Sequence, residues 1–234
     1  PTAAVVDSEG FTVGLRDGSC RRLVGERNAL DVEGERHAGP VRALATSKTA
    51  ALSGGDDGAV LWWKAGGRAE LLERNPGTRA RAVAVGADGE RAAWSFDDGL
   101  LVLWSLKFGK EISREKDTPA LALAFSPDGA VLALGREDKS VVLLDAATGK
   151  PLRRLEGHDG AVGALAFSPD GKLLASGAAD QRVQLWDVAS GREQGKLHAA
   201  RDLLGSLAFS ADGRALAVGA DDGAVTEPFA VRPV

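Results

Sequence analysis

The sequence has few of the residues from which disulfides, metal sites and membrane spans are built. Its 234 residues include one Cys (Cys20), three His and no Met or Tyr. A single Cys excludes an internal disulfide and a zinc site built from several Cys ligands. No apolar run approaches the roughly 20 residues that a membrane-spanning helix needs. We therefore expect no metal, no cofactor and no insertion into a membrane.

An excess of charge of one sign is missing as well. The chain has 29 Lys and Arg against 33 Asp and Glu, which gives a net charge of -4. Such a slightly acidic protein has no general attraction to nucleic acid, so we expect no nucleic-acid partner. The lone Cys fits a reducing compartment, and we expect a cytoplasmic protein. Because the initiator Met is absent, a periplasmic or secreted location and a place within a longer polypeptide stay open.

Glycine, in contrast, is abundant, and short segments repeat. The 30 Gly are about twice the share of an average protein, so many tight turns are expected. A segment of the form Ala-Phe-Ser-x-Asp-Gly recurs every 42 residues, at 124–129, 166–171 and 208–213. A second marker, an Asp in a turn, recurs at steps of 40 to 42 residues. Its copies are Asp17, Asp57, Asp98, Asp138, Asp180 and Asp222. Two markers in register indicate six repeats of one structural unit.

Each unit has the pattern of short strands joined by turns, which is clearest between residues 162 and 198. The nearly continuous apolar run 162–167 is typical of a buried strand, and a Pro-Asp-Gly turn follows at 169–171. Two further strands at 173–177 and 183–186 precede a more polar one at 193–198. Four short strands every 40 to 42 residues are typical of a propeller blade.

The sequence thus predicts an all-β fold, a β-propeller of about six four-stranded blades, in a single domain over residues 1–234. The approximate repeats are 1–36, 37–76, 77–116, 117–157, 158–199 and 200–234.

The fifth unit resembles the WD40 repeat. It carries Gly157-His158, then Phe167-Ser168-Pro169-Asp170-Gly171, Ala175-Ser176-Gly177, Asp180 and Trp186-Asp187. In that family a blade can hold a hydrogen-bonded tetrad of His, Ser or Thr, Asp and Trp, and buried polar groups need such pairing. The resemblance implies two tetrads in this chain. They are His158, Ser176, Asp180 and Trp186 in the fifth unit, and His37, Ser53, Asp57 and Trp63 in the second.

The other four units keep only part of this pattern. Their turn Asp remains, but apolar residues stand where Ser or Trp would be. These substitutes are Trp94 in unit three, Leu134 and Leu144 in unit four, Val218 and Pro228 in unit six, and Leu23 in unit one. We expect those blades to depend on apolar packing and on their turns.

The end of the chain leaves the closure of the predicted ring open. There is room for about 23 strands, one fewer than six complete blades need. Either Phe229 to Val234 supplies the outer strand of the last blade, or a segment outside the sequence does. If that segment is a whole blade, the propeller has seven blades.

Groups that could suggest a catalytic or metal site have structural explanations. His37 and His158 occupy the structural His positions of the WD40 resemblance, and we expect His198 to be exposed on an outer strand. Three His about 40 to 120 residues apart, with one Cys, do not indicate a metal cluster. Cys20 falls on a buried strand and is expected to act as a small hydrophobe. We expect no catalytic residue and no enzymatic activity.

Residues that the repeat does not explain are the candidates for partner binding. The same repeat position, near the start of the inner strand, is occupied by Arg42 in unit two and by Arg81 in unit three. Arg79 lies two residues before Arg81. We expect these side chains near one mouth of the channel, where a basic patch suits an acidic peptide or another carboxylate-bearing partner. The alternative is that these arginines are ordinary surface residues in contact with solvent and bind no partner. Trp62 is the aromatic residue most suited to exposure, because Trp63 takes the inward position.

The leading hypothesis is a non-enzymatic protein–protein interaction scaffold that presents a rigid propeller face to a protein or peptide partner. This hypothesis rests on the family resemblance, since fold alone does not determine function. One alternative is a regulatory or sensing domain of a larger protein or complex. Another is a ligand-binding or enzymatic propeller that uses its central channel, which would require ionisable side chains to converge there.

Overall fold

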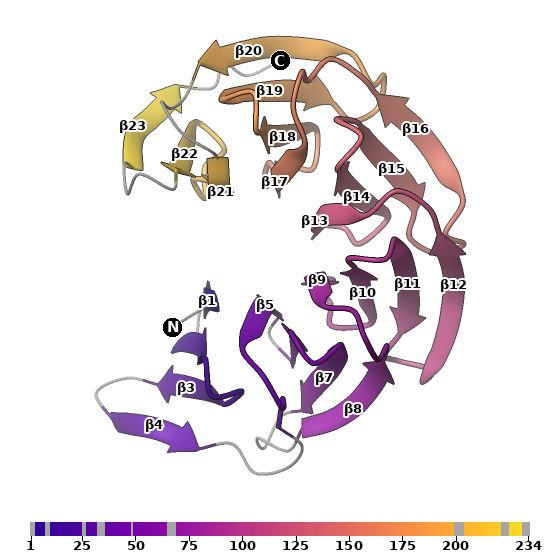
Figure 1. The fold of residues 1–234 in the computed structure, drawn as a ribbon. Coiled ribbons are helices and arrows are strands. Elements are labelled where there is room, and N and C mark those ends of the chain that lie inside the picture. Colours follow the sequence, from indigo (N-terminus) through magenta and orange to yellow (C-terminus); the bar gives the residue numbers. More distant parts are fainter. Residues whose placement is uncertain are drawn as a thin grey trace. The chain divides into compact units, whose positions relative to one another are not determined.

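The computed structural model of the protein is built from strands (Figure 1). It describes residues 3–7, 10–24, 27–31, 36–47, 49–64, 69–198, 204–220 and 225–230. Within these ranges the chain forms 23 strands and no helix, which confirms the all-β prediction and its strand number. Consequently the same ranges contain no helix that could span a membrane. The chain divides into two compact units, residues 1–120 and 121–234.

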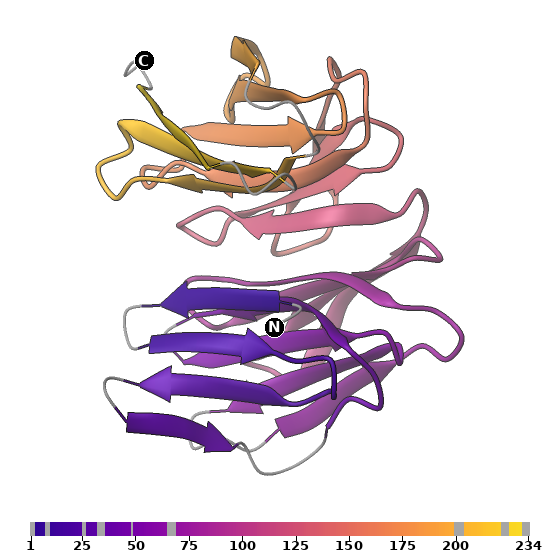
Figure 2. The same cartoon turned by 60° about the vertical axis from the view of Figure 1, so that its left-hand side comes forward.

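Unit 1 contains three four-stranded antiparallel sheets. The first sheet consists of β1 (Ala3–Asp7), β2 (Gly10–Gly14), β3 (Cys20–Val24) and β4 (Arg27–Asp31). The second consists of β5 (Val41–Thr46), β6 (Ala50–Gly55), β7 (Ala59–Lys64) and β8 (Ala69–Arg74). The third consists of β9 (Ala80–Val85), β10 (Arg91–Phe96), β11 (Leu100–Ser105) and β12 (Lys110–Lys116). Paired strands are consecutive in the chain, and the indigo strands near the N-terminus alternate in direction (Figure 2).

Unit 2 repeats this arrangement. Its first sheet consists of β13 (Ala120–Phe125), β14 (Val131–Arg136), β15 (Val141–Asp145) and β16 (Pro151–Leu155). The second consists of β17 (Val162–Phe167), β18 (Leu173–Ala178), β19 (Arg182–Asp187) and β20 (Glu193–His198). The last has three strands among the described residues, β21 (Leu204–Phe209), β22 (Ala215–Ala220) and β23 (Val225–Ala230). Each sheet therefore corresponds to one sequence repeat.

The repeated Ser and Asp residues build the hairpin turns. In the turn between β17 and β18, the Ser168 hydroxyl donates to Asp170 Oδ1 at 2.6 Å and accepts the Leu173 amide at 2.9 Å. Gly171 closes this turn with a φ of +71°, a left-handed conformation that suits glycine. In the next turn Asp180 accepts the Arg182 amide at 3.0 Å. These bonds join residues within five positions of each other, so the turns follow from local sequence.

Apolar side chains fill the space between neighbouring sheets inside each unit. In unit 1 a buried cluster joins residues of β6, β7, β9, β10 and β11, with Trp94 and Phe96 fully buried. Trp94 occupies the position of the tetrad Ser, and its ring centre lies 6.0 Å from that of Trp104. Leu134 and Leu144 are likewise buried in the fourth repeat. Blades without a tetrad are thus held by apolar packing at the same positions.

The last sheet corrects one prediction about the end of the chain. Phe229 lies in β23, the third strand of its sheet, and it is paired with Leu216 of β22. It therefore does not begin an outer strand. Antiparallel pairing runs from Val225 to Ala230, so the third strand begins at Val225 as predicted and extends past Pro228 and Phe229. Residues 231–234 lie outside the described residues.

Candidate functional site

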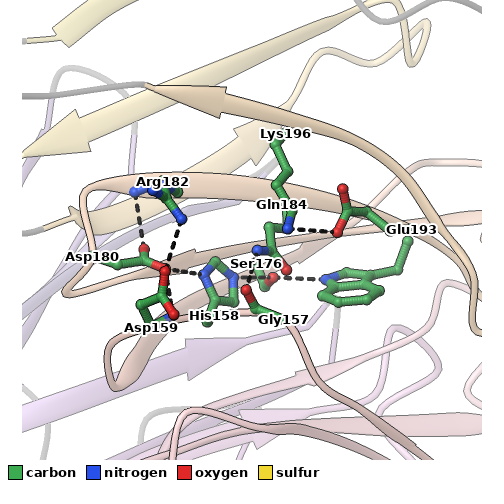
Figure 3. Close-up of polar contacts among 10 residues, drawn as sticks. Gly157, His158, Asp159, Ser176, Asp180, Arg182, Gln184, Glu193 and Lys196 are labelled. Atoms are coloured by element: carbon green, nitrogen blue, oxygen red, sulfur yellow. Dashed lines mark hydrogen bonds and ion pairs between the residues drawn. The ribbon is translucent and has the colours of Figure 1, made fainter.

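The fifth repeat, in unit 2, contains a hydrogen-bonded polar tetrad (Figure 3). The loop before β17 supplies His158, β18 supplies Ser176, the β18–β19 turn supplies Asp180, and β19 supplies Trp186. His158 Nδ1 lies 3.0 Å from Asp180 Oδ2, and His158 Nε2 lies 2.8 Å from Ser176 Oγ. Trp186 Nε1 donates to the same Ser176 oxygen at 2.8 Å. The structure thus brings all four residues into one hydrogen-bonded chain.

Hydrogen-bonding capacity determines the direction of each bond in this chain. The Asp180 carboxylate can only accept, so His158 Nδ1 carries the proton that it donates. His158 Nε2 is then an acceptor, and the Ser176 hydroxyl donates to it. The same hydroxyl oxygen still has a lone pair for the indole N–H of Trp186. Each polar atom along the path is satisfied, although Ser176 is fully buried.

The second repeat builds the same chain in unit 1. His37 lies 3.0 Å from Asp57 through Nδ1 and 2.8 Å from Ser53 through Nε2. Trp63 donates to Ser53 at 2.8 Å. Burial lowers the pKa of His37 below its ordinary value, although the hydrogen bond to Asp57 acts in the opposite direction. His37 is therefore a neutral structural link near pH 7.

The two tetrad carboxylates also hold the backbone of the loop that precedes the inner strand. Asp57 accepts the Ala38 amide at 2.8 Å, and Asp180 accepts the Asp159 amide at 2.8 Å. Burial by itself raises the pKa of both carboxyls, but hydrogen bonds from these amides and from the His rings lower it overall. Every tetrad group makes a structural hydrogen bond, so the two chains tie loops to strands.

Gln184 is a buried polar residue that the sequence reasoning missed. It lies on β19 opposite Ser176, it is fully buried, and its Nε2 donates to the Gly157 carbonyl at 2.8 Å. The corresponding position in the second repeat is the apolar Leu61, opposite Ser53. A single polar residue inside the apolar sequence of β19 was the available signal. Gln184 fixes the loop that carries His158.

The three candidate arginines lie at one end of the second and third sheets. Arg42 makes a two-point contact with Asp56, with bonds of 2.8 and 2.7 Å. These hydrogen bonds hold the pKa of the Asp56 carboxyl below its usual range. Arg79 lies 3.8 Å from the same carboxylate, and Arg81 lies 3.7 Å from Asp97. The arginines therefore form a mixed network with carboxylates instead of an isolated basic patch.

A surface hollow of about 390 Å³ lies within this network. Its lining includes Asp56 and Asp57 from the β6–β7 turn, Gly77 to Arg79 from the loop before β9, and Asp97 from the β10–β11 turn.

Trp62, the aromatic residue expected to be exposed, is partly buried and packs against the apolar cluster that contains Leu52 and Trp94. Its ring therefore contributes to the core of unit 1.

The remaining predicted groups have structural roles or lie beyond the description. Cys20 is buried, and burial raises the pKa of its thiol to about 11. The side chain of His198 lies outside the described residues. Among the residues whose positions are described, no three His, Cys, Asp or Glu side chains form a group that could hold a metal ion.

Sheets of four consecutive antiparallel strands, repeated once per 40 to 42 residues, define a β-propeller. A chain in a crystal structure of the mitotic checkpoint complex matches 97% of this protein with a TM-score of 0.84. The match covers 72% of that chain at 21% identity, so the likeness concerns the fold alone.

Sequence comparison identifies the kind of propeller. The family model for the WD domain, G-beta repeat, matches residues 149–187, and that for the anaphase-promoting complex subunit 4 WD40 domain matches residues 102–160. Residues 102–187 therefore carry repeats of the WD40-repeat family. Propellers of this family are typically protein-interaction scaffolds and are generally not enzymes.

Two curated relatives are similar over part of their length. The chain is 32% identical to human (Homo sapiens) angio-associated migratory cell protein over 104 residues, which are 42% of this chain and 24% of that protein. It is 26% identical to the ciliary WD repeat-containing protein ctxp80 of Euplotoides octocarinatus over 186 residues, 66% of this chain and 25% of that protein. The matched part thus spans about a quarter of the length of either relative.

Proposed function

We propose that the protein is a non-enzymatic scaffold that binds a protein or peptide partner at the end of unit 1 where Arg42, Arg79 and Arg81 gather. The WD40 repeats at residues 102–187 support the general role. The choice of surface rests on one observation, the loose pairing of Arg79 and Arg81. Their side chains are 61% and 48% exposed, and the nearest carboxylates among the described residues lie 3.8 and 3.7 Å away. Those separations are too long for hydrogen bonds, so the guanidinium donors are available to a partner.

The chemistry of this surface favours a segment with spaced carboxylates. A guanidinium group binds a carboxylate through two parallel hydrogen bonds, and Arg79 and Arg81 can each offer such a pair. Asp56 and Asp97 border the same hollow and repel additional acidic groups. A partner with one or two well-placed carboxylates therefore fits better than a continuous acidic run. Arg42 contributes less, because its two-point contact with Asp56 already uses two of its five N–H donors.

The rigidity of the surface supports the same role. Arg81 lies on β9, and Arg79 directly precedes this strand, whose neighbour β10 belongs to the same sheet. The Asp97 amide donates to the Arg79 carbonyl at 3.1 Å, which fixes the loop against the β10–β11 turn. A partner therefore orders few backbone dihedrals when it binds, and the entropic cost of association is small.

The test is a charge reversal at the two loosely paired arginines. The wild-type chain is used to capture proteins from an extract of the cells that make it, and the captured protein is identified and purified. Its affinity is then measured for the wild type and for the Arg79→Glu, Arg81→Glu double variant. We expect at least about a hundredfold weaker binding, because two charge-assisted contacts become repulsive. Binding of the wild type should also weaken as salt increases.

A matched variant separates this effect from a general loss of positive charge. Arg192 and Arg214 are exposed residues of hairpin turns in unit 2, and their side chains line no part of the hollow. The Arg192→Glu, Arg214→Glu double variant has the same net charge as the test variant and should bind within about twofold of the wild type. Equal weakening in both variants, or none in either, would refute the assignment of this surface.

A further inference from the structure

The turn between β11 and β12 presents an exposed aromatic side chain. Three large hydrophobic residues are exposed in the described part of the chain, and Phe108 is the most exposed of them. Its exposed fraction is 70%, against 42% for Leu71 and 51% for Leu152. Phe108 also differs in position, because Leu71 and Leu152 lie within strands whereas Phe108 lies at a hairpin turn. An exposed Phe at such a site offers apolar area that a partner can bury.

The backbone of this turn is held in place although its side chain is exposed. The amides of Leu106 and Lys107 both donate to the Glu90 carbonyl, at 2.8 and 3.3 Å. The Phe108 amide donates to the Ser105 hydroxyl at 3.2 Å. The Leu106 side chain is buried in the apolar cluster of unit 1, and this packing holds the turn against the core. Phe108 is therefore presented on a fixed support.

Two cations flank the aromatic ring. The ammonium groups of Lys107 and Lys110 lie 5.9 and 5.8 Å from the Phe108 ring centre. Lys107 is paired with Glu90 at 2.6 Å. Positive charge beside an exposed ring complements a partner surface in which carboxylates border an apolar pocket.

This turn lies at the opposite end of the third sheet from the proposed arginine surface. Ser105 of β11 is paired with Arg91 of β10 and Lys110 of β12, so the turn adjoins the start of β10. The arginine surface adjoins the other end, where Phe96 of β10 is paired with Ala80 of β9. Six-residue strands separate the two ends by about 20 Å. The two surfaces can therefore be occupied at the same time.

We propose that the β11–β12 turn, residues 105–110, is a second interaction surface that inserts Phe108 into an apolar pocket bordered by carboxylates on a protein partner. Charge disfavours a lipid surface as the occupant. The protein has a net charge of -4, and of the two lysines Lys107 is already paired with Glu90. One aromatic ring with so little excess positive charge provides less than the two signals that stable membrane attachment requires.

Photo-crosslinking tests the proposal on the full chain. Phe108 is replaced by p-benzoylphenylalanine, and the exposed Leu152 of β16 is replaced in the same way as the matched control. Both variants are irradiated in an extract of the cells that make the protein, and cross-linked peptides are sequenced. We expect position 108 to capture one protein partner through a segment that contains both apolar and acidic residues, with a yield about tenfold above that of position 152. The Arg79→Glu, Arg81→Glu variant should keep this cross-link, which separates this proposal from the previous one.

Measurements with the identified partner complete the test. Phe108→Ala should weaken its binding about tenfold or more, while Leu152→Ala should change it within about twofold. Lys107→Glu with Lys110→Glu should also weaken it, and thermal unfolding should be unchanged because all three side chains are exposed. Equal yields at positions 108 and 152, cross-linking to a second copy of this chain, or co-sedimentation with phosphatidylserine vesicles that depends on Phe108 would each overturn the proposal.

Discussion

Removal of the Ser176 hydroxyl should destabilise the fifth blade strongly for so small a change. Ser176→Ala deletes one oxygen, which accepts the Trp186 indole N–H at 2.8 Å and lies 2.8 Å from His158 Nε2. Both partners are buried, with exposed fractions of 3% for Trp186 and 7% for His158. The Trp186 indole N–H and His158 Nε2 would then each lack a hydrogen-bond partner at a buried position. Since a buried polar group without a partner costs about 1 to 3 kcal/mol, we expect a total loss of about 2 to 6 kcal/mol for the two groups.

The assay is urea unfolding followed by tryptophan fluorescence and by circular dichroism. A change in stability appears as a lower midpoint at unchanged slope. Ser190→Ala is the matched control, because the Ser190 hydroxyl donates to Asp187 in an exposed turn of the same blade. We expect the control to lose less than about 1 kcal/mol.

A double-mutant cycle attributes the loss to the hydrogen bond itself. Trp186→Phe keeps an aromatic ring but removes the indole N–H, so the double variant with Ser176→Ala leaves only His158 without its partner. The two single losses should therefore exceed the loss of the double variant by about 1 kcal/mol. A loss below about 0.5 kcal/mol for Ser176→Ala, or strict additivity in the cycle, would refute the hydrogen-bonded chain.

Three further predictions concern unit 1. Burial lowers the pKa of His37 from its ordinary 6.5, so the unfolded chain takes up its proton first as the pH falls. The contribution of His37 to stability should be constant above about pH 6.5 and decrease below it, and His37→Gln should remove this part of the pH dependence of the urea midpoint. The Cys20 thiol, whose pKa burial raises to about 11, should react with iodoacetamide at about pH 8 roughly a hundredfold more slowly than in the urea-unfolded chain; equal rates would contradict its burial. Gly77 and Gly99 share a φ of +84°, but a Cβ on Gly99 would lie 1.8 Å from the Asp117 carbonyl oxygen, whereas a Cβ on Gly77 meets nothing within 4 Å. Gly77→Ala should thus cost about 1 to 2 kcal/mol in urea unfolding and Gly99→Ala clearly more, and equal losses would mean that close packing at Gly99 has no effect.

Much of the fold could be predicted because its determinants are local in sequence. The turn that contains Ser168, Asp170 and Gly171 is made by bonds within five residues, and the same residues recur in other repeats. Short apolar runs between such turns become strands, and a strand pairs with the next one along the chain. The tetrads also came from the sequence, because a family resemblance assigns a role to each position of the repeat.

The end of the last strand could not be predicted from local sequence. Pro228 and Phe229 interrupt the repeat pattern, which indicated that the third strand stops before them. Pairing with β22 continues to Ala230 all the same. Proline is tolerated in a strand wherever its missing N–H is not needed for the ladder, and the sequence does not reveal which side of the strand is paired.

The chemistry of the surface depended on contacts between distant residues. The sequence predicted a basic patch that contains Arg42, Arg79 and Arg81. Their positions in the repeat were known, but the residues around them were not. The structure places Asp56 and Asp97 among them, from turns that belong to the second and third sheets. Charge pairing of this kind is a property of the assembled sheets, since the partners lie 14 to 23 residues apart and meet only after the strands have paired.

The sequence by itself predicted a β-propeller, because turn residues and strand periodicity act over a few residues and recur in phase. Its resemblance to the WD40 repeat implied the two polar tetrads. Tertiary structure decided which polar and apolar groups remain available to a partner. Trp62 packs against the core of unit 1, whereas Phe108 stays exposed between two lysines. Both are aromatic residues in the same unit, and only the packing of neighbouring strands distinguishes a ring that stabilises the fold from one that is free to bind.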